Sequence, residues 1–394
     1  MNYRKQESLV PPDLLQVLLK PVADAGSAFA RLDERIARSP VGGGFLERTQ
    51  YADACASLWI DGELVHLEDL VLHDSLRDIR TPTHELTIAR DVLRTRRRIV
   101  SQPPAWALSE DGLRSLRQTR PGQAWPAASL GDGGAGVADE AATGEVADGP
   151  GLAEGDGEAG EDILDAELAA IDALLARSEA VIEQARKPGP AKSAPGPAPG
   201  RERDPLVYDF DWDEDARLEE WRAMLRGAQE FPAVLQAIIA LDAWNEIAVL
   251  QHAGWMGRLL AASILRHGGV TSGGHLAAIN LGLKTIPVDR RRHRHRETRL
   301  LAIAQGFIAA AEIGLKEHDR LALARQMMER KLAGRRTSSK LPELVELVMA
   351  KPLVSAGMVA KTLDVTPQGA RRIVLELGLR EMTGRGRFRA WGVI

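Results

Sequence analysis

The side chains most suited to recognising a charged partner gather in one short segment near the C-terminus. They are polar and cationic residues at the start of an expected helix, together with the threonine that would cap it and one glycine: Thr366, Gln368, Gly369, Arg371 and Arg372. A glutamine amide can pair with adenine, and a guanidinium can pair with guanine or with a phosphate oxygen. This combination predicts binding to double-stranded DNA.

A second cationic group follows a few residues later in the chain. Arg385 and Arg387 alternate with Gly384 and Gly386, and Arg389 comes shortly after them. Glycines permit a tight turn between two strands, and the arginines supply positive charge where such a hairpin would meet phosphate. We therefore predict that Arg385, Arg387 and Arg389 belong to a basic wing beside the DNA-binding helix.

Two short helices are expected before the helix that carries the first group. Residues 341–350 repeat apolar side chains at helical spacing, and the pattern stops at Pro352 because proline lacks the N–H that a helix needs. Ser355 is a suitable N-cap for a second helix that ends near Leu363. The first two helices of a helix-turn-helix are therefore expected here.

The third helix is the one that would present the recognition residues. It is expected over 367–377, with Thr366 as its N-cap, proline at its first position and Gly378 at its C-terminal cap. Its apolar residues can face a core: Ile373, Val374 and Leu377. Strands over 379–382 and 388–393 would complete a winged helix-turn-helix between residues 341 and 394.

Two alternatives to DNA binding remain for this segment. It could be a small helical domain with a solvated basic face, or a winged helix that contacts another protein, because one fold hosts many functions. The ordered combination of cap, turn, proline-started helix and arginine hairpin favours DNA.

Charge is strongly segregated along the 394 residues, although the net charge is only −4. Residues 281–394 hold 23 Lys and Arg against 11 Asp and Glu, whereas residues 130–162 hold 10 acidic residues and no basic ones. A basic C-terminal region fits a nucleic-acid partner, and the acidic middle does not.

Cysteine content and hydropathy bear on the compartment. Cys55 is the single cysteine, which excludes an intramolecular disulfide and a four-cysteine zinc site, and it is expected to be a small buried residue. The N-terminal residues lack the apolar stretch of a secretory signal, and no run reaches the ~18 apolar residues of a membrane span. We expect a soluble cytoplasmic protein without a membrane partner.

Composition divides the chain into four parts. Residues 1–120 and 206–335 predict two helical regions. Residues 121–205 are rich in Gly, Ala, Pro, Asp and Glu and predict a disordered linker, interrupted by one amphipathic helix over 161–187. With the winged domain at 341–394, the fold class is mainly α: a helical bundle body, a disordered acidic and Pro/Gly-rich middle, and a C-terminal winged helix-turn-helix.

Three local features of the helical regions have their own interpretations. Val41–Gly44 is expected to be a loop because of its glycines. Four arginines are expected at a helix terminus, where the helix dipole favours cations, or on a solvated face, rather than at a second DNA contact: Arg94, Arg96, Arg97 and Arg98. The cationic tract 287–299 fits an arm that adds phosphate contacts, an exposed loop, or a set of arginines paired with acidic neighbours.

The chain as a whole resembles a bacterial family of unknown function in which a helical domain precedes a C-terminal helix-turn-helix DNA-binding domain. The resemblance rests on residues 47–74, on residues 281–321 and on the winged segment described above. It implies DNA binding and says nothing about reaction chemistry.

A fainter resemblance concerns Fic-family proteins. Ser57–Gly62 is similar to the Ser-x-x-x-Glu-Gly inhibitory helix of that family, with aspartate in place of glutamate, and Gly254–Leu260 is similar to the end of the Fic motif. Aligning the motif's second glycine on Gly254 places Ile247 at the catalytic histidine, Gln251 at the acid and Ala253 at the asparagine. The resemblance thus implies a catalytically degenerate copy, since AMP transfer needs a proton acceptor and an anion-binding loop.

Taken together, these observations predict a DNA-binding transcriptional regulator rather than an enzyme. We expect no catalytic residues, no cofactor and no metal; His293 and His295 stand among arginines that would repel a cation. A homodimer is a possible assembly, because helix-turn-helix proteins often read two-fold operators, and any small-molecule effector is left undefined. The alternative is a degenerate Fic-like protein that acts as an interaction scaffold.

Overall fold

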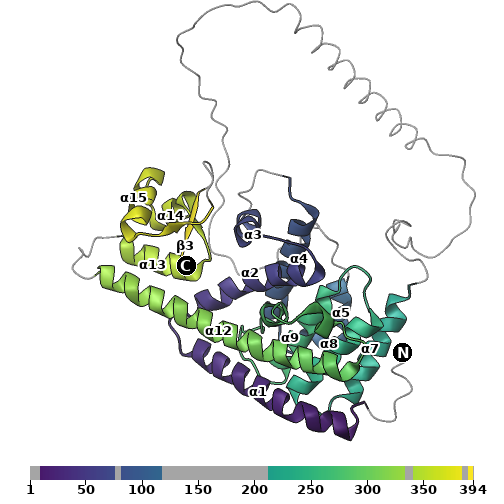
Figure 1. Ribbon diagram of the computed structural model, residues 1–394. Coiled ribbons are helices and arrows are strands. Elements are labelled where there is room, and N and C mark those ends of the chain that lie inside the picture. Colours follow the sequence, from purple (N-terminus) through teal and green to yellow (C-terminus); the bar gives the residue numbers. More distant parts are fainter. Residues whose placement is uncertain (1–8, 76–80, 118–211, 333–339, 384–388, 394) are drawn as a thin grey trace, which may run out of the picture. The chain divides into compact units, whose positions relative to one another are not determined.

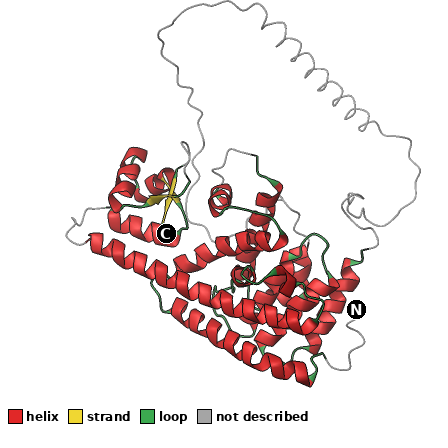
Figure 2. Ribbon diagram, in the orientation of Figure 1, coloured by secondary structure: helices red, strands yellow, loops and turns green. Residues whose placement is uncertain are grey.

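The computed structural model describes residues 9–75, 81–117, 212–332, 340–383 and 389–393. They belong to one compact unit that is built mainly of helices, with a small sheet near the C-terminus (Figures 1 and 2). The mainly α fold class is thereby confirmed. The expected linker over 121–205, its amphipathic helix, and the two wing arginines Arg385 and Arg387 lie outside the described residues.

Helices make up both parts of the body. The N-terminal part contains α1 (Pro12–Ala37), α2 (Gly42–Asp61), α3 (Leu67–Asp74), α4 (His84–Ser101), the 3₁₀ turn η2 (Trp106–Leu108) and α5 (Glu110–Arg117). The second part contains α7 (Glu214–Gly227), α8 (Ala233–Ile247), α9 (Trp255–His267), α10 (Ile279–Leu283), α11 (Val288–Arg291) and α12 (Arg296–Leu332). The expected helical regions on both sides of the linker are therefore present.

The body is organised around α12, which packs against α1 (Figure 1) and also against α10. Its Phe307 is fully buried and meets Phe29 of α1 edge to face, with ring centroids 6.2 Å apart. α12 is also the one helix among the described residues that is long and apolar enough to cross a membrane, although 56% of its most apolar window is buried inside the protein. These apolar residues thus serve as core.

Two buried tryptophans join α7 to α8. The rings of Trp221 and Trp244 lie edge to face with centroids 5.3 Å apart, and the Trp221 indole donates a hydrogen bond to the Ala240 carbonyl. Gly257 of α9 packs on the same cluster, since a Cβ there would come within 2.3 Å of the Trp244 ring. This glycine therefore allows α9 to approach α8 closely.

The prediction of a loop over Val41–Gly44 is wrong, because α2 begins at Gly42. A Cβ at Gly42 would lie 2.3 Å from the Ile36 carbonyl oxygen, and a Cβ at Gly44 would lie 2.0 Å from the Met349 carbonyl oxygen. Because these glycines have no Cβ, the α2 backbone can lie close to its neighbours; the glycines do not make the chain flexible here.

Arg98 lies in the last turn of α4, as expected of a helix terminus, but the alternative of a solvated face is wrong for Arg96. Its side chain is fully buried and forms an ion pair with Asp53, a hydrogen bond to Gln50 and a hydrogen bond to the Leu276 carbonyl. Asp53 also accepts hydrogen bonds from the backbone and side chain of Asn280. Burial raises the pKa of Asp53 and lowers that of Arg96, and their mutual attraction opposes both shifts.

The cationic tract 287–299 ends in residues that pair with the body. Arg299 donates to Asp242 at 2.7 Å and reaches Glu246 at 3.1 Å, and Arg296 lies 3.3 Å from Asp242. The interpretation as arginines paired with acidic neighbours is therefore correct for these two, whereas Arg292 and Arg294 are exposed.

Cys55 is half-buried rather than fully buried. Desolvation nevertheless raises the pKa of its thiol to about 12, so the reactive thiolate is disfavoured at neutral pH. The expectation of a small buried residue is therefore met only in part.

Candidate nucleic-acid interface

The C-terminal segment folds as three helices and a three-stranded antiparallel sheet. The helices are α13 (Leu341–Ala350), α14 (Ala356–Leu363) and α15 (Pro367–Leu377), and the strands are β1 (Val354–Ser355), β2 (Arg380–Glu381) and β3 (Ala390–Gly392) in the order β1-β3-β2. The sequence predicts all three helices. It predicts β2 and β3 as longer strands and misses β1, which pairs Val354 with Trp391.

The expected caps are present at the ends of these helices. The Ser355 hydroxyl accepts from the Met358 amide, and the Thr366 hydroxyl accepts from the Gly369 amide at 3.1 Å. Gly378 ends α15 with a φ of 73°, the left-handed conformation that glycine adopts without strain. Local sequence therefore determines where the recognition helix begins and ends.

One face of α15 is buried and the other is open. Ala370, Val374 and Leu377 lie in the core of the winged domain, and Ile373 is half-buried. On the opposite face the predicted DNA-contacting residues are exposed, apart from the half-buried glycine: Thr366, Gln368, Gly369, Arg371 and Arg372. The structure thus brings these side chains together on one accessible surface.

The two arginines of this surface differ from those of the body. Neither Arg371 nor Arg372 forms an ion pair with any of the residues that the structure describes. An exposed guanidinium without a protein carboxylate keeps its donors for a phosphate or a base edge. This arrangement suits the recognition of a polyanion.

The wing is described only at its base. Arg389 is exposed at the start of β3, and its Nε lies 3.6 Å from the Glu381 carboxylate of β2. An exposed pair at that distance is weak, so the guanidinium remains able to turn towards phosphate.

The winged domain rests on the body through α13, which packs against α2 and α12 (Figure 1). Leu344 and Val348 share a hydrophobic cluster with Phe45 of α2 and Leu321 of α12. The exposed side of α15 takes no part in this cluster, whereas the last turn of the helix is held by a hydrogen bond from Lys331 to the Leu377 carbonyl at 3.0 Å. Docking on the body therefore leaves the recognition surface open.

The two segments that resemble Fic proteins are in direct contact. Arg258, only 6% exposed, forms two hydrogen bonds with the Asp61 carboxylate at 2.6 and 3.0 Å and one with the Ser57 hydroxyl at 2.9 Å. Arg258 is therefore an ion-pair residue. Ile247, at the position of the catalytic histidine in the alignment, is buried among apolar side chains.

These features define a helical protein that carries a C-terminal winged helix-turn-helix DNA-binding domain. Comparison with known proteins agrees with this class. Residues 206–333 match a family described as "Protein of unknown function (DUF1612)", and residues 341–394 match one described as "HTH DNA binding domain". The chain is also 70% identical over 382 residues to the "Uncharacterized protein y4cF" of Sinorhizobium fredii (strain NBRC 101917 / NGR234), an alignment that covers 96% of this chain and 97% of that protein.

The chain therefore belongs to the DUF1612 family, in which a helical domain of unknown function precedes a helix-turn-helix DNA-binding domain. The resemblance that the sequence carries over 47–74, 281–321 and the winged segment is confirmed.

Proposed function

We propose that this protein is a transcriptional regulator that binds double-stranded DNA with α15 in the major groove and with the wing on the flanking backbone. The observation that carries the proposal is the exposure of Gln368, Arg371 and Arg372 on a capped helix whose other face is buried. The helical body then serves dimerisation or effector response in the cytoplasm, and no catalytic residue, cofactor or metal is required. A dimer would place two copies of α15 on a two-fold operator.

The test uses the full chain and DNA fragments selected by it from a random pool. Replacing Arg371 and Arg372 together by alanine should weaken binding to the selected fragment by ~1–3 kcal/mol for each base-directed contact, as measured by mobility shift. Wild-type affinity should also fall steeply as salt rises, because each neutralised phosphate releases counterions.

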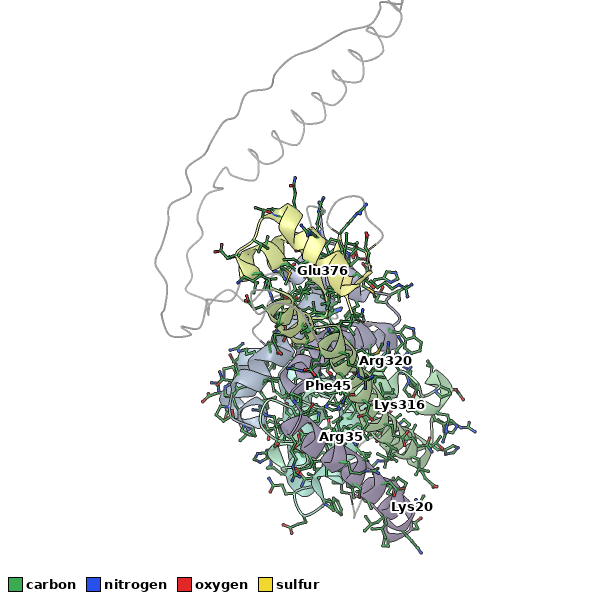
Figure 3. The ribbon with its side chains drawn as sticks, turned by 90° about the vertical axis from the view of Figure 1, so that its left-hand side faces the viewer. Lys20, Arg35, Phe45, Lys316, Arg320 and Glu376 are labelled. Atoms are coloured by element: carbon green, nitrogen blue, oxygen red, sulfur yellow. The ribbon has the colours of Figure 1, made fainter. Side chains whose placement is uncertain are left out.

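A matched control removes the same charge elsewhere. Lys20 and Lys316 are exposed side chains of α1 and α12, and Figure 3 places Lys20 at the far end of the body from Glu376 of α15. The Lys20→Ala/Lys316→Ala variant should bind the selected DNA within about twofold of the wild type. If the Arg371→Ala/Arg372→Ala variant binds the selected DNA as tightly as the control variant, α15 is not the recognition helix.

A second candidate function is an interaction scaffold descended from a Fic protein. The specific observation in its favour is the contact of Arg258 with Ser57 and Asp61, which joins the two segments that resemble that family. Because Ile247 replaces the proton acceptor, this candidate expects no transfer of labelled AMP to any protein, even from an Asp61→Ala variant. A scaffold should co-purify with a stoichiometric partner and give no mobility shift with selected DNA.

A further inference from the structure

A cavity of about 360 Å³ lies where the winged domain meets the body. Its apolar walls come from Phe29 and Leu32 of α1, Phe45 of α2, Leu321 of α12 and Val393 beyond β3. Figure 3 shows Phe45 inside the body, below the winged domain that carries Glu376. The volume falls in the range of small-molecule sites, roughly 300–1,000 Å³, and the site is too small for a folded partner.

One buried cation connects this cavity to the winged domain. Arg48 of α2 lines the cavity, and its Nη2 donates to the Val348 carbonyl at 2.5 Å and to the Lys351 carbonyl at 2.8 Å. These carbonyls belong to the C-terminal end of α13, where the helix leaves its last acceptors unsatisfied. Arg48 therefore holds the end of α13 against α2.

Arg48 has donor capacity that the protein does not use. Its Nε is buried without a hydrogen-bond partner among the described residues. Burial lowers the pKa of the guanidinium to about 10, and the nearby Glu317 charge opposes that shift only in part. A buried donor left without an acceptor is costly. Nε is closed to solvent, so a ligand in the cavity supplies that acceptor only when the guanidinium turns towards it.

The charged side chains that line the cavity are two guanidiniums and one carboxylate. Glu317 is already paired with Arg320 at 3.0 Å, and both side chains are exposed at the rim. His275 also lines the cavity, and its Nδ1 lies 2.7 Å from an Asp33 carboxylate oxygen, which leaves Nε2 as its other polar atom. Arg48 and Arg320 thus line the cavity with one carboxylate, Glu317, whereas the Asp33 carboxylate is held by His275 and Ser272 and does not line it. The lining is suited to an anion.

We propose that this cavity is an effector site for a small carboxylic acid with an apolar body. The carboxylate accepts hydrogen bonds from Arg48, and the apolar part contacts Phe29, Phe45 and Leu321. A guanidinium binds a planar carboxylate through parallel hydrogen bonds, which explains why an acid is favoured over a neutral ligand of the same shape.

The site can couple ligand binding to DNA binding, a consequence that rests on the function proposed above. A carboxylate that recruits the Arg48 donors competes with the Val348 and Lys351 carbonyls, which hold the end of α13 to α2. α13 carries α14 and α15, so loosening its end changes how the winged domain is seated on the body. A ligand shifts such an equilibrium only by its difference in affinity for the two states.

The experiment measures binding to the full chain without DNA. Octanoate and phenylacetate are the probes, octanamide and phenylacetamide are their neutral counterparts, and calorimetry and thermal unfolding are the readouts. At least one acid should bind with a Kd below about a millimolar and raise Tm, and its amide should bind about ten- to hundredfold more weakly because it lacks the charge that Arg48 recognises.

Two variants test the site from different directions. Arg48→Met removes the cation. Ala52→Leu narrows the cavity and leaves Arg48 in place. The second variant therefore still tests the site if the first one does not fold. Each should weaken binding of the acid at least about tenfold, whereas Lys316→Ala, on α12 but outside the cavity lining, should not. Circular dichroism checks that each variant is folded.

The possible results separate this proposal from the DNA-binding function. If neither acid binds, or if the folded Ala52→Leu variant binds as well as the wild type, the effector site is wrong. If the Arg371→Ala/Arg372→Ala variant binds the acid normally but not DNA, the ligand site and the DNA-binding surface are separate sites, as expected. If the wild type does not bind DNA, the proposed coupling is wrong, but the proposal of a ligand site is unaffected.

Discussion

Arginines are used in opposite ways in the winged domain and in the body. On α15, Arg371 and Arg372 are exposed and have no ion-pair partner within the described residues. On α4, Arg96 is fully buried and bound to Asp53, Gln50 and a carbonyl. The difference shows that a cluster of cations stays available to an outside partner only where the protein supplies no carboxylate for it.

The largest effect that this comparison predicts is on stability. Arg96→Met should lower the free energy of unfolding by ~3–5 kcal/mol, because it leaves the Asp53 charge buried without a cation. Arg371→Met should change it by no more than ~0.5 kcal/mol, because that side chain is at the surface. Urea unfolding monitored by circular dichroism measures the free energy of unfolding of both variants. Similar decreases for Arg96→Met and Arg371→Met would contradict the proposed difference between buried and exposed arginines.

A smaller effect is expected from Asp33, which holds His275 beside the cavity. Hydrogen bonds from His275 and Ser272 outweigh desolvation and lower the pKa of Asp33 to about 2. A carboxyl whose folded pKa lies below its unfolded value of 3.8 contributes stability above about pH 4, and that stability is lost as pH falls towards about 2. Asp33→Asn should flatten the acid dependence of unfolding in this window, while Asp24→Asn, at an exposed position on the same helix, should not.

The smallest effect should come from Arg389 at the base of the wing. Its exposed pair with Glu381 at 3.6 Å contributes at most ~1 kcal/mol, so Arg389→Ala should leave Tm almost unchanged. If the side chain meets phosphate, the same variant should lower the salt slope of DNA binding by about one unit without changing sequence preference. A change in Tm with no change in salt slope would make Arg389 structural.

The recognition helix could be predicted almost completely from sequence because its signals are local. Thr366, Pro367 and Gly378 act within a few residues of themselves through caps and backbone preferences. The short strand β1 escaped prediction because it exists only through pairing with β3, far along the chain. The cavity could not be predicted from the sequence either, because its walls come from α1, α2, α12 and the winged domain.

The amino-acid sequence alone was sufficient for the helical periodicity, the caps and the polar face of α15, because these depend on side chains a few positions apart. Tertiary structure decided which arginines are buried, why Gly42 and Gly44 are helical, and that Arg48 reaches the carbonyls of α13. Those outcomes depend on which distant segments supply a carboxylate, a carbonyl or a close backbone, and spacing along the chain does not encode such neighbours.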